Sequence, residues 1–409
     1  MTIEKKRRVA IISLHTSPLA QPGVGDSGGM NVYVREMASA LAQQGTECVV
    51  YTRADAADLP REVVVEPGHR VVHVQAGPHH LPKEALTDII DEFTEAVVDD
   101  IEARGGVDAV HAHYWLSGEV GHALKHRFDV PLIVTFHTLA RVKGAGGDLE
   151  SGYREAAEAT QIGCADAVCV SCDAERSELI EHYGVPAGRV VIVSPGVEHA
   201  IFGPGDRCGA RKAIGEDDDV RLVLFAGRIQ ALKGPDVAIR ALALMNEPRA
   251  RLLVVGGASG SNGHVQEEEM RLLADELGLS DRIRFVAPQP HHLLSTFYRA
   301  ADVIVVPSRS ESFGLVALEA AACGTPVVAS AVGGLTSLVE DGVTGILVHS
   351  RTPSAFAEAL DAVLSDSAMA TSMSMAGAVA SLDYSWTAAA SRLNEVYSEL
   401  CSAGLLECR

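Results

Sequence analysis

The sequence contains few aromatic residues and no long hydrophobic run. Aromatic residues make up 5% of the 409 residues, although hydrophobic residues as a whole make up 47%. This balance favours an α/β protein with an aliphatic core over an all-β protein. No apolar run approaches the ~18 residues that a membrane-spanning helix needs. The N-terminal run VAIISL is also too short for the core of a signal peptide, so we expect a cytoplasmic protein with no membrane partner.

Positive charge is scarce. The chain has 34 Lys and Arg against 54 Asp and Glu, which gives a formal net charge of −20. A surface this acidic repels nucleic acids and anionic lipid, so neither is an expected partner. If the ligand carries phosphate, a few deliberately placed basic residues must hold it.

The eight cysteines follow no regular framework. Cys169 and Cys172 form a C-x-x-C pair, but they end the apolar run ADAVCVSC, which reads as a buried strand. Metal or redox use would need a second ligand pair or a helix start at the first cysteine. We therefore interpret both as structural thiols.

Short apolar runs alternate with helical patterns and fall into two sets. The first set, predicted as parallel strands, is 9–14, 47–52, 71–76, 109–113, 132–137, 167–171 and 190–194, and the second is 221–227, 251–257, 282–287, 302–308, 326–330 and 345–348. A Gly- and Pro-rich linker near 196–215 separates them. Strand–helix alternation with fully apolar strands predicts an α/β fold of two Rossmann-like domains facing each other across a cleft. Ligands in such sheets bind at the carboxyl ends of the strands.

Two glutamates in the second set bracket the run ESFGLVALE. Glu311 lies at the N-terminal end of a predicted helix and Glu319 lies about two turns inside it. Free backbone N–H groups between them can hold a diphosphate, and each carboxylate can hold a sugar hydroxyl. Arg228 and Lys233 follow another strand of the same set, in FAGRIQALKG, and together predict a diphosphate clamp. The loop GGASGSNG (256–263) also follows a strand and either contacts the nucleotide or is a flexible loop.

The loop after the first strand matches G-x-G-x-x-G at Gly23, Gly25 and Gly28. This leaves open a nicotinamide-dependent oxidoreductase. However, eight residues, HTSPLAQP, separate the first glycine segment from the strand, whereas a dinucleotide fingerprint follows its strand almost at once. The longer loop instead favours a glycine-rich flap that opens a helix near Asn31 and lets the backbone approach a ligand.

Several polar residues end strands of the first set. They are His15, His113, Tyr114, His137 and Thr138. One histidine at such a position is more often structural, but several polar side chains at one sheet edge indicate a ligand site.

These motifs resemble the retaining GT-B glycosyltransferases of the family that includes sucrose and glycogen synthases. FAGRI-x-x-x-KG, ESFGLVALE and GTPVVAS-x-VGG are similar to that family's donor-domain signature, and the resemblance spans nearly the whole chain. HTSPLAQPGVGDSGGMNVYV, VHAHYWLSG and TFHTLARVK resemble members that glycosylate a cyclitol phosphate. The resemblance implies transfer of N-acetylglucosamine from UDP-N-acetylglucosamine to 1D-myo-inositol 3-phosphate with retention, the first step of mycothiol biosynthesis.

The resemblance also implies domain bounds and a partner. The acceptor-binding domain would be 1–200, completed by a C-terminal helix at 385–409 that crosses back to it, and the nucleotide-sugar domain would be 201–384. The protein would form a homodimer. The segment GAGGDLESGY before Arg154 departs from the family pattern, as does Gln289, where relatives often carry Arg.

Site residues follow from the same resemblance. Catalytic roles fall on Arg228, Lys233, Glu311 and His137. Donor binding falls on Gln21, Pro22, Gly29, Arg228, Lys233, Gln289, Glu311 and Glu319, with Glu319 on the uridine ribose. Acceptor binding falls on His15, Asp26, Ser27, Gly28, Gly29, Met30, Asn31, Lys83, Tyr114, Thr138 and Arg154. The resemblance also implies a possible Mg²⁺ held by backbone or side-chain oxygens around Tyr298, Arg299, Ala301 and Thr325. This set has no carboxylate, so we expect no cofactor to be required for the chemistry.

Two further interpretations stay open at this point. One is a different retaining UDP-sugar transferase, for example an enzyme that makes sucrose phosphate, because the donor motifs do not distinguish acceptors. The other is a sugar-nucleotide-binding protein without activity, which the intact set of Arg228, Lys233, Glu311 and Glu319 disfavours.

Overall fold

The computed structural model describes residues 6–145, 151–258 and 263–408. Half of the GAGGDLESGY segment (146–150) and half of the GGASGSNG segment (259–262) lie outside these residues. The described chain forms two compact units. The first comprises residues 1–20, 30–195 and 386–409, and the second comprises 21–29 and 196–385. The segment Gln21–Gly29 thus groups with the second unit, although the sequence bounds place it in the first.

The first unit contains one eight-stranded sheet, in the order β3-β4-β2-β1-β5-β6-β7-β8. Its strands are β1 (Arg8–Ile12), β2 (Glu47–Arg53), β3 (Glu62–Glu66), β4 (His69–Val74), β5 (Ala109–His113), β6 (Leu132–Thr135), β7 (Ala167–Val170) and β8 (Val190–Ile192). All neighbours are parallel except β3, which pairs antiparallel with β4 at the sheet edge. We did not predict β3. Its run EVVVE is short and only partly buried, as edge strands often are.

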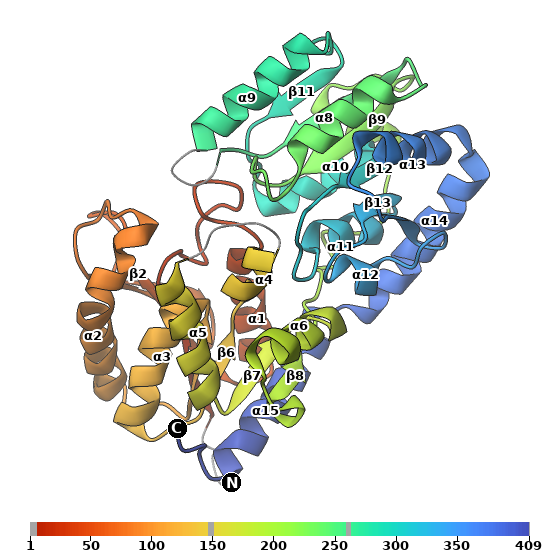
Figure 1. The fold of residues 1–409 in the computed structure, drawn as a ribbon. Coiled ribbons are helices and arrows are strands. Elements are labelled where there is room, and N and C mark those ends of the chain that lie inside the picture. Colours follow the sequence, from red (N-terminus) through yellow and green to blue (C-terminus); the bar gives the residue numbers. More distant parts are fainter. Residues whose placement is uncertain (1–5, 146–150, 259–262, 409) are drawn as a thin grey trace. The chain divides into compact units, whose positions relative to one another are not determined.

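Helices cover both faces of this sheet (Figure 1). Helices α2 (Ile90–Ala103), α3 (Trp115–Phe128) and α5 (Gly152–Cys164) pack on one face through a continuous aliphatic core. Helix α1 (Gly29–Gln43) and the C-terminal α15 (Trp386–Ser402) lie on the other face, where Tyr397 of α15 contacts His111 of β5. The short α4 (Ala140–Ala145), the 3-10 helices η1 (Lys83–Ile89) and η2 (Ala187–Arg189), and α6 (Asp173–Tyr183) complete the unit.

The second unit contains a six-stranded parallel sheet, in the order β11-β10-β9-β12-β13-β14. Its strands are β9 (Arg221–Ala226), β10 (Ala250–Val255), β11 (Ile283–Val286), β12 (Val303–Val306), β13 (Val327–Ser330) and β14 (Gly345–Val348). This is the strand order of a Rossmann fold, and it reverses between β9 and β12. The parallel strands of the first unit reverse in the same way between β1 and β5. Both units are therefore doubly wound parallel-sheet domains, as predicted.

Two layers of helices also enclose the second sheet (Figure 1). Helices α7 (Arg207–Ile214), α10 (Leu294–Ala300), α11 (Leu315–Ala322) and α12 (Leu335–Leu338) share one core, and α8 (Pro235–Leu244), α9 (Gly263–Glu276) and α13 (Pro353–Ser365) share the other. The 3-10 helices η3 (His291–Leu293) and η4 (Ser381–Asp383) and the long α14 (Ser367–Ala380) complete the unit. Helix α7 lies inside the predicted linker, because Asp206 caps its start and Gly215 ends it in the left-handed conformation.

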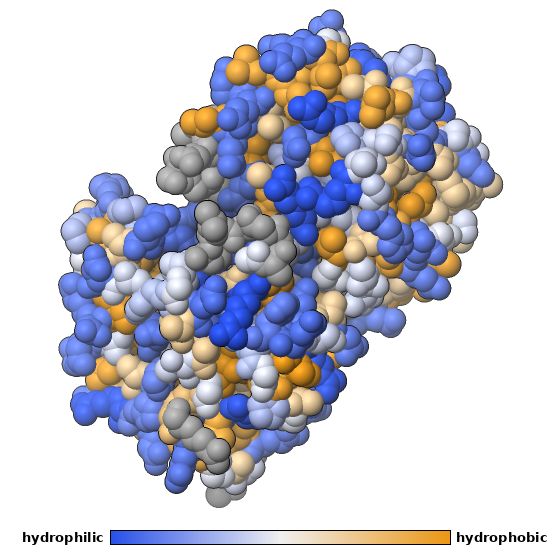
Figure 2. Space-filling view, viewed as in Figure 1, coloured by the Kyte–Doolittle hydropathy of each residue, from blue (hydrophilic) through white to orange (hydrophobic). Residues whose placement is uncertain are grey.

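Hydrophilic side chains dominate the visible surface, with hydrophobic residues scattered among them (Figure 2). Among the described residues, no helix combines the length and the apolar character that crossing a membrane requires.

Candidate functional site

In the second unit, two predicted residues meet at the point where the strand order reverses. Lys233 follows β9 and Glu311 follows β12, and the Lys233 Nζ lies 2.6 Å from the Glu311 Oε2. The hydroxyl of Ser308 donates to the same carboxylate oxygen at 3.1 Å. Both charged side chains stay partly accessible to solvent, at 25% and 17%. The structure thus places a cation and a carboxylate at the position where doubly wound folds bind ligands.

The loop that carries Glu311 depends on two glycines after β13. The Glu311 carbonyl accepts a 2.8 Å hydrogen bond from the Gly334 N–H. A Cβ on Gly333 would lie 2.1 Å from that carbonyl oxygen, and Gly333 has a φ of +46°. Only glycines allow this close approach of two backbones, which explains the VGG of the sequence motif. Helix α11 then begins at Leu315, so its N–H groups open beside Glu311.

Glu319 is buried and already has two partners in the protein. The hydroxyl of Tyr298 donates to its Oε2 at 2.8 Å, and the His291 Nε2 lies 2.6 Å from its Oε1. The Glu319 side chain is 5% exposed. Sequence reasoning missed His291, although its position after β11 was a usable signal. These contacts fix the carboxylate in one orientation, as recognition of a sugar hydroxyl requires.

Arg228 contacts the glycine-rich segment that precedes α1. Its Nη1 lies 3.5 Å from the carbonyl oxygen of Asp26, and a Cβ on Gly28 would lie 3.3 Å from its Nε. The side chain of Gln21 donates to the carbonyl of Pro288 at 2.8 Å. The predicted residues Gln21, Pro22, Asp26, Ser27, Gly28 and Gly29 therefore group with Arg228 and with the loop of Gln289 in the second unit. The side-chain amide of Gln289 donates to the Ala287 carbonyl at 2.9 Å.

The four residues predicted for Mg²⁺ offer only uncharged oxygen atoms, and two of these atoms are hydrogen-bonded to each other. Thr325 donates its hydroxyl to the Tyr298 carbonyl at 2.6 Å. The guanidinium of Arg299 is a cation and donates to the carbonyls of Gly203 and Ile201. Ala301 offers only its backbone carbonyl. Mg²⁺ in proteins is usually bound by carboxylates and phosphates, so this set fits it poorly and we derive no step through a metal.

In the first unit, the predicted residues gather around Tyr114, which follows β5. Its ring lies 4.5 Å from that of His15, which follows β1, the other strand at the reversal. The Lys83 Nζ lies 4.7 Å from the ring centroid and the guanidinium carbon of Arg154 lies 5.0 Å from it. Thr138 joins them by accepting from Arg154 at its carbonyl (2.8 Å) and its hydroxyl (3.1 Å). Two positive charges therefore lie against one tyrosine ring at this sheet edge.

Backbone strain marks the same sheet edge. Tyr114 and His137, which follow the adjacent strands β5 and β6, have φ values of +75° and +62°. Non-glycine residues rarely adopt this conformation, and it persists only where the surrounding structure holds it, often at functional sites. Helix α3 starts directly after Tyr114, so its N-terminal N–H groups also open at this edge.

A buried carboxylate positions Arg154. Glu158, one turn along α5, accepts from the Arg154 Nε at 2.8 Å and from the Ala140 N–H at 2.9 Å. The hydroxyl of Tyr183 donates to the Glu158 Oε2, the oxygen that also accepts the 2.9 Å bond from Ala140. Sequence reasoning missed Glu158, although its i, i+4 spacing from Arg154 was a signal.

His137 belongs to a column of three histidines. Its Nε2 lies 3.0 Å from the His113 Nδ1, and the His113 ring stacks on that of His111 at 4.3 Å between centroids. Burial lowers the pKa of His111 and of His137 to about 3, and burial followed by the other two rings lowers that of His113 well below its ordinary value. All three imidazoles are therefore neutral near pH 7. A neutral imidazole can exchange hydrogen bonds with a hydroxyl without adding charge to the site.

The remaining first-unit predictions lie at the start of α1. Asn31 is buried, and its amide donates to the Thr16 hydroxyl at 2.7 Å and to the Ser17 carbonyl at 2.6 Å. It fixes the loop that carries His15. Met30 packs against the aliphatic core of the unit.

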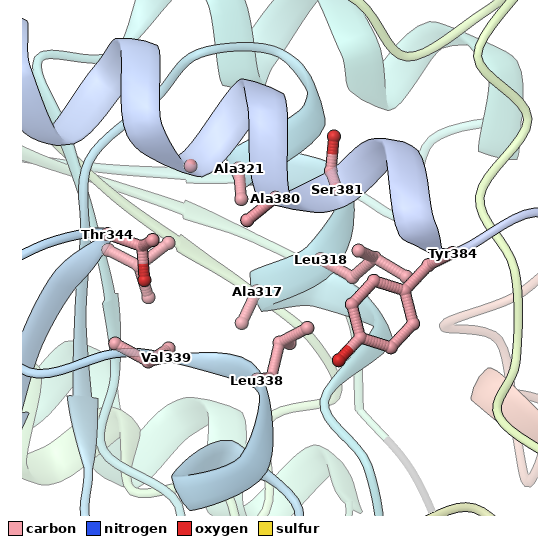
Figure 3. A pocket seen from close by; sticks show the side chains of 11 residues that line it. Ala317, Leu318, Ala321, Leu338, Val339, Thr344, Ala380, Ser381 and Tyr384 are labelled. Atoms are coloured by element: carbon pink, nitrogen blue, oxygen red, sulfur yellow. The ribbon is translucent and has the colours of Figure 1, made fainter.

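A small cavity in the second unit has a different character. Residues of α11, α12 and α14 line it, and Figure 3 shows Leu318, Leu338 and the ring of Tyr384 around it. Its volume of about 10 Å³ holds no more than about one water molecule. It is a packing defect too small for a sugar nucleotide.

Two family models match the chain. Residues 28–196 match a model described as a glycosyl transferase 4-like domain, and residues 207–379 match one described as glycosyl transferases group 1. The first match covers the unit that contains Tyr114 and the second covers the unit that contains Lys233.

Curated relatives are similar over most of the chain. The D-inositol 3-phosphate glycosyltransferase of Acidothermus cellulolyticus is 48% identical over 88% of this chain and 83% of its own length. The protein of the same name from Thermobispora bispora is 45% identical over 96% of this chain and 94% of its own. The one from Mycobacterium bovis is 47% identical over 88% and 75%.

Solved structures agree on the fold. A sucrose-phosphate synthase from Thermosynechococcus elongatus has a TM-score of 0.91 and 34% identity, over 97% of this chain and 99% of that one. An Anabaena protein solved with UDP and glucose has a TM-score of 0.79 over 96% of this chain and 100% of that one, but at 19% identity it supports the fold alone.

Proposed function

The chain belongs to the glycosyltransferase family that includes the D-inositol 3-phosphate glycosyltransferases, and on that premise we propose that it transfers a sugar from a UDP-sugar donor to inositol 3-phosphate. The donor we propose is UDP-N-acetylglucosamine, with retention at the anomeric carbon, as the first step of mycothiol biosynthesis. The main support for a phosphorylated acceptor is the pair of cations, Lys83 and Arg154, that lie against the ring of Tyr114.

In the second unit, Lys233 would bind the donor diphosphate. Its ammonium lies at a strand end beside the start of α11, so the cation and the helix N-terminus would act on the same phosphates. Arg228 would add a second cation. Glu319, held by Tyr298 and His291, would accept from the ribose hydroxyls. Glu311 would bind the hydroxyls of the donor sugar.

In the first unit, the phosphate of the acceptor would bind between Lys83 and Arg154. Burial of the Arg154–Glu158 pair fixes the guanidinium, so little side-chain entropy is lost when the phosphate binds. A bound phosphate orients the inositol ring and brings one hydroxyl into position. His137, as a neutral imidazole, would hydrogen-bond to the reacting sugars.

The chemistry we propose needs no protein nucleophile and no metal. The acceptor hydroxyl would attack the anomeric carbon from the face that UDP leaves and would pass its proton to a donor phosphate oxygen. Arg228 and Lys233 would stabilise the charge that develops on the departing diphosphate. Full activity after treatment with EDTA is the expected result, and loss of activity that Mg²⁺ restores would contradict this part.

A second acceptor class has specific support, because the sucrose-phosphate synthase is 34% identical over nearly the full chain. In that case the cations around Tyr114 would bind a hexose phosphate. The higher identity to the D-inositol 3-phosphate glycosyltransferases, at 48%, favours the cyclitol phosphate.

The decisive experiment is a transferase assay corrected for donor hydrolysis. UDP-N-acetylglucosamine and UDP-glucose are each offered with inositol 3-phosphate, free inositol and fructose 6-phosphate. We expect turnover with UDP-N-acetylglucosamine and inositol 3-phosphate. Equal use of free inositol would refute the phosphate site, and turnover of fructose 6-phosphate instead would favour the second acceptor class. The homodimer is a further proposal from the resemblance, and light scattering of the purified protein tests it. The cytoplasmic location is a further proposal from the short N-terminal apolar run.

A further inference from the structure

Four metal-binding side chains meet in the first unit at a place that the proposed reaction does not use. They are His122 and His126 of α3, Cys164 at the end of α5, and Cys408 in the segment after α15. One ligand atom from each lies within 4.8 Å of all the others. Two cysteines and two histidines are a common ligand set of structural zinc sites.

The helix spacing brings the two histidines together. His122 and His126 are four residues apart, so they occupy the same face of α3, and their ring centroids lie 4.9 Å apart. The His126 Nε2 lies 3.5 Å from the Cys164 Sγ and 3.2 Å from the Cys408 Sγ. Zn–N bonds of about 2.0–2.1 Å and Zn–S bonds of about 2.3 Å at tetrahedral angles separate N and S ligands by roughly 3.6 Å. The observed separations are close to that value.

The fold anchors the segment that brings Cys408 to this place. Lys125 and Asp166 form a buried ion pair at 2.8 Å, with side chains 3% and 5% exposed. The Lys125 Nζ also donates to the Leu406 carbonyl at 3.0 Å, and the Leu406 N–H donates to the Asp166 Oδ1 at 2.7 Å. A residue two positions before Cys408 is therefore bound on both its N–H and its C=O, and Lys125 also donates to the Cys164 carbonyl. The same pair holds both cysteines in place.

We propose that these four side chains bind one Zn²⁺ ion when both cysteines are in the dithiol form. Each thiol would lose its proton and bind as a thiolate, and each histidine would bind as a neutral imidazole, so the complex of ion and ligands has no net charge. The ligand set fills all four positions and leaves none for substrate, as in a structural site. The ion would tie the C-terminal segment to α3 and α5.

The alternative state of these cysteines is a disulfide. The structure places the two sulfur atoms in bonding contact. A disulfide accounts for the cysteines but gives no role to two imidazoles that each have a ring nitrogen within 4.8 Å of both sulfur atoms, whereas a zinc ion uses all four groups. For zinc to bind, the sulfur atoms must separate to roughly 3.8 Å, the distance between two ligands at about 2.3 Å from the ion. Cys408 and His126 are exposed, so side-chain rotation can provide this movement.

The test measures metal content under reducing conditions. The full chain is reduced with a phosphine, supplied with Zn²⁺, desalted and analysed for zinc, and the Co²⁺ complex is examined for the visible absorption of tetrahedral sulfur ligation. We expect about one zinc per chain, and loss of at least tenfold in zinc affinity for His126→Ala and Cys408→Ser. Both residues are exposed, so these variants should fold.

Two substitutions outside the cluster serve as matched controls. Cys208→Ser and His349→Ala remove an exposed cysteine and an exposed histidine of the second unit and should leave zinc binding unchanged. The proposal is overturned if the reduced chain binds no zinc, or if the cluster variants bind as tightly as the parent. If oxidation removes two titratable thiols and the reduced chain takes up no zinc, the two cysteines form a disulfide and no zinc site.

Discussion

The Nε of Arg154 donates a 2.8 Å hydrogen bond to the Oε1 of Glu158, and both side chains are almost completely buried, at 3% and 0% exposed. Breaking one partner of such a pair leaves an uncompensated buried charge. Because Glu158 also accepts from the Ala140 N–H, it connects the guanidinium to the first residue of α4. The guanidinium therefore has one orientation. Its Nη2 donates to the Thr138 carbonyl, and its central carbon lies 5.0 Å from the centroid of the Tyr114 ring.

Glu158→Gln should weaken acceptor binding more than donor binding. The amide keeps the shape of the side chain but removes the charge that orients Arg154, so we expect the KM for inositol 3-phosphate to rise about tenfold, equivalent to about 1.4 kcal/mol. The KM for the UDP-sugar should change little. Glu155→Gln, on the exposed side of the same helix, is the matched control. Steady-state kinetics with each substrate varied in turn would contradict the assignment if both KM values rose together.

Lys233→Ala should lower kcat strongly. The charge on the departing diphosphate is greatest in the transition state, so removal of the cation should reduce kcat by about 10²-fold, the size of effect seen when one such donor is lost. The variant also leaves the Glu311 carboxylate without its 2.6 Å partner. Lys233→Arg keeps the charge and should recover part of the rate.

The control for this variant is Lys212→Ala, which removes an exposed lysine of α7. Single-turnover measurements with saturating donor separate the chemical step from binding. An effect confined to the donor KM would show that Lys233 binds the donor equally strongly in the ground state and in the transition state.

The sequence was sufficient to predict most of the second-unit site because its residues lie in short motifs at strand ends. Strand alternation with fully apolar runs predicted both sheets, and the carboxyl-end rule placed Lys233 and Glu311 together, as they are in the structure. The positions of His15, Tyr114, Thr138 and Arg154 around one ring agree with their predicted grouping, although their roles stay predictions.

What the sequence did not reveal depends on contacts between distant segments. His291 reaches Glu319 across 28 positions, and Cys408 reaches His126 across 282. No local pattern encodes such pairs, because the whole unit must fold before they meet. The edge strand β3 was missed for a different reason, since its three valines lie between glutamates and bury only part of their surface.

Glu319→Gln should weaken UDP binding. The carboxylate is a stronger acceptor for ribose hydroxyls than an amide, and hydrogen bonds to a charged group contribute about 1.5–3 kcal/mol, so an increase in the Kd for UDP of roughly tenfold or more is expected. Tyr298→Phe removes one bond that orients the carboxylate and should give a smaller effect. Isothermal titration calorimetry with UDP measures both, and an unchanged Kd for Glu319→Gln would refute the ribose assignment.

Glu175, at the start of α6, should make the stability of the first unit depend on pH. Burial raises its pKa from the ordinary value of 4.5 to about 7, an effect that the hydrogen bond from Ser171 partly offsets and that the nearby Glu178 increases. The protonated form is therefore favoured in the folded state. Its stabilising contribution is complete below about pH 4.5 and is lost as pH rises to about 7, and a shift of this size corresponds to about 3 kcal/mol.

Glu175→Gln stays neutral at every pH and should remove this dependence. The unfolding free energy of the variant minus that of the parent should increase by about 3 kcal/mol between pH 4.5 and pH 7.5. Both tryptophans, Trp115 and Trp386, belong to the first unit, so their fluorescence during urea unfolding reports on the relevant part of the chain. Glu181→Gln, at an exposed position of the same helix, should show a constant difference from the parent. A constant difference for Glu175→Gln as well would mean that the buried carboxylate ionises in the folded state as easily as it does in the unfolded chain.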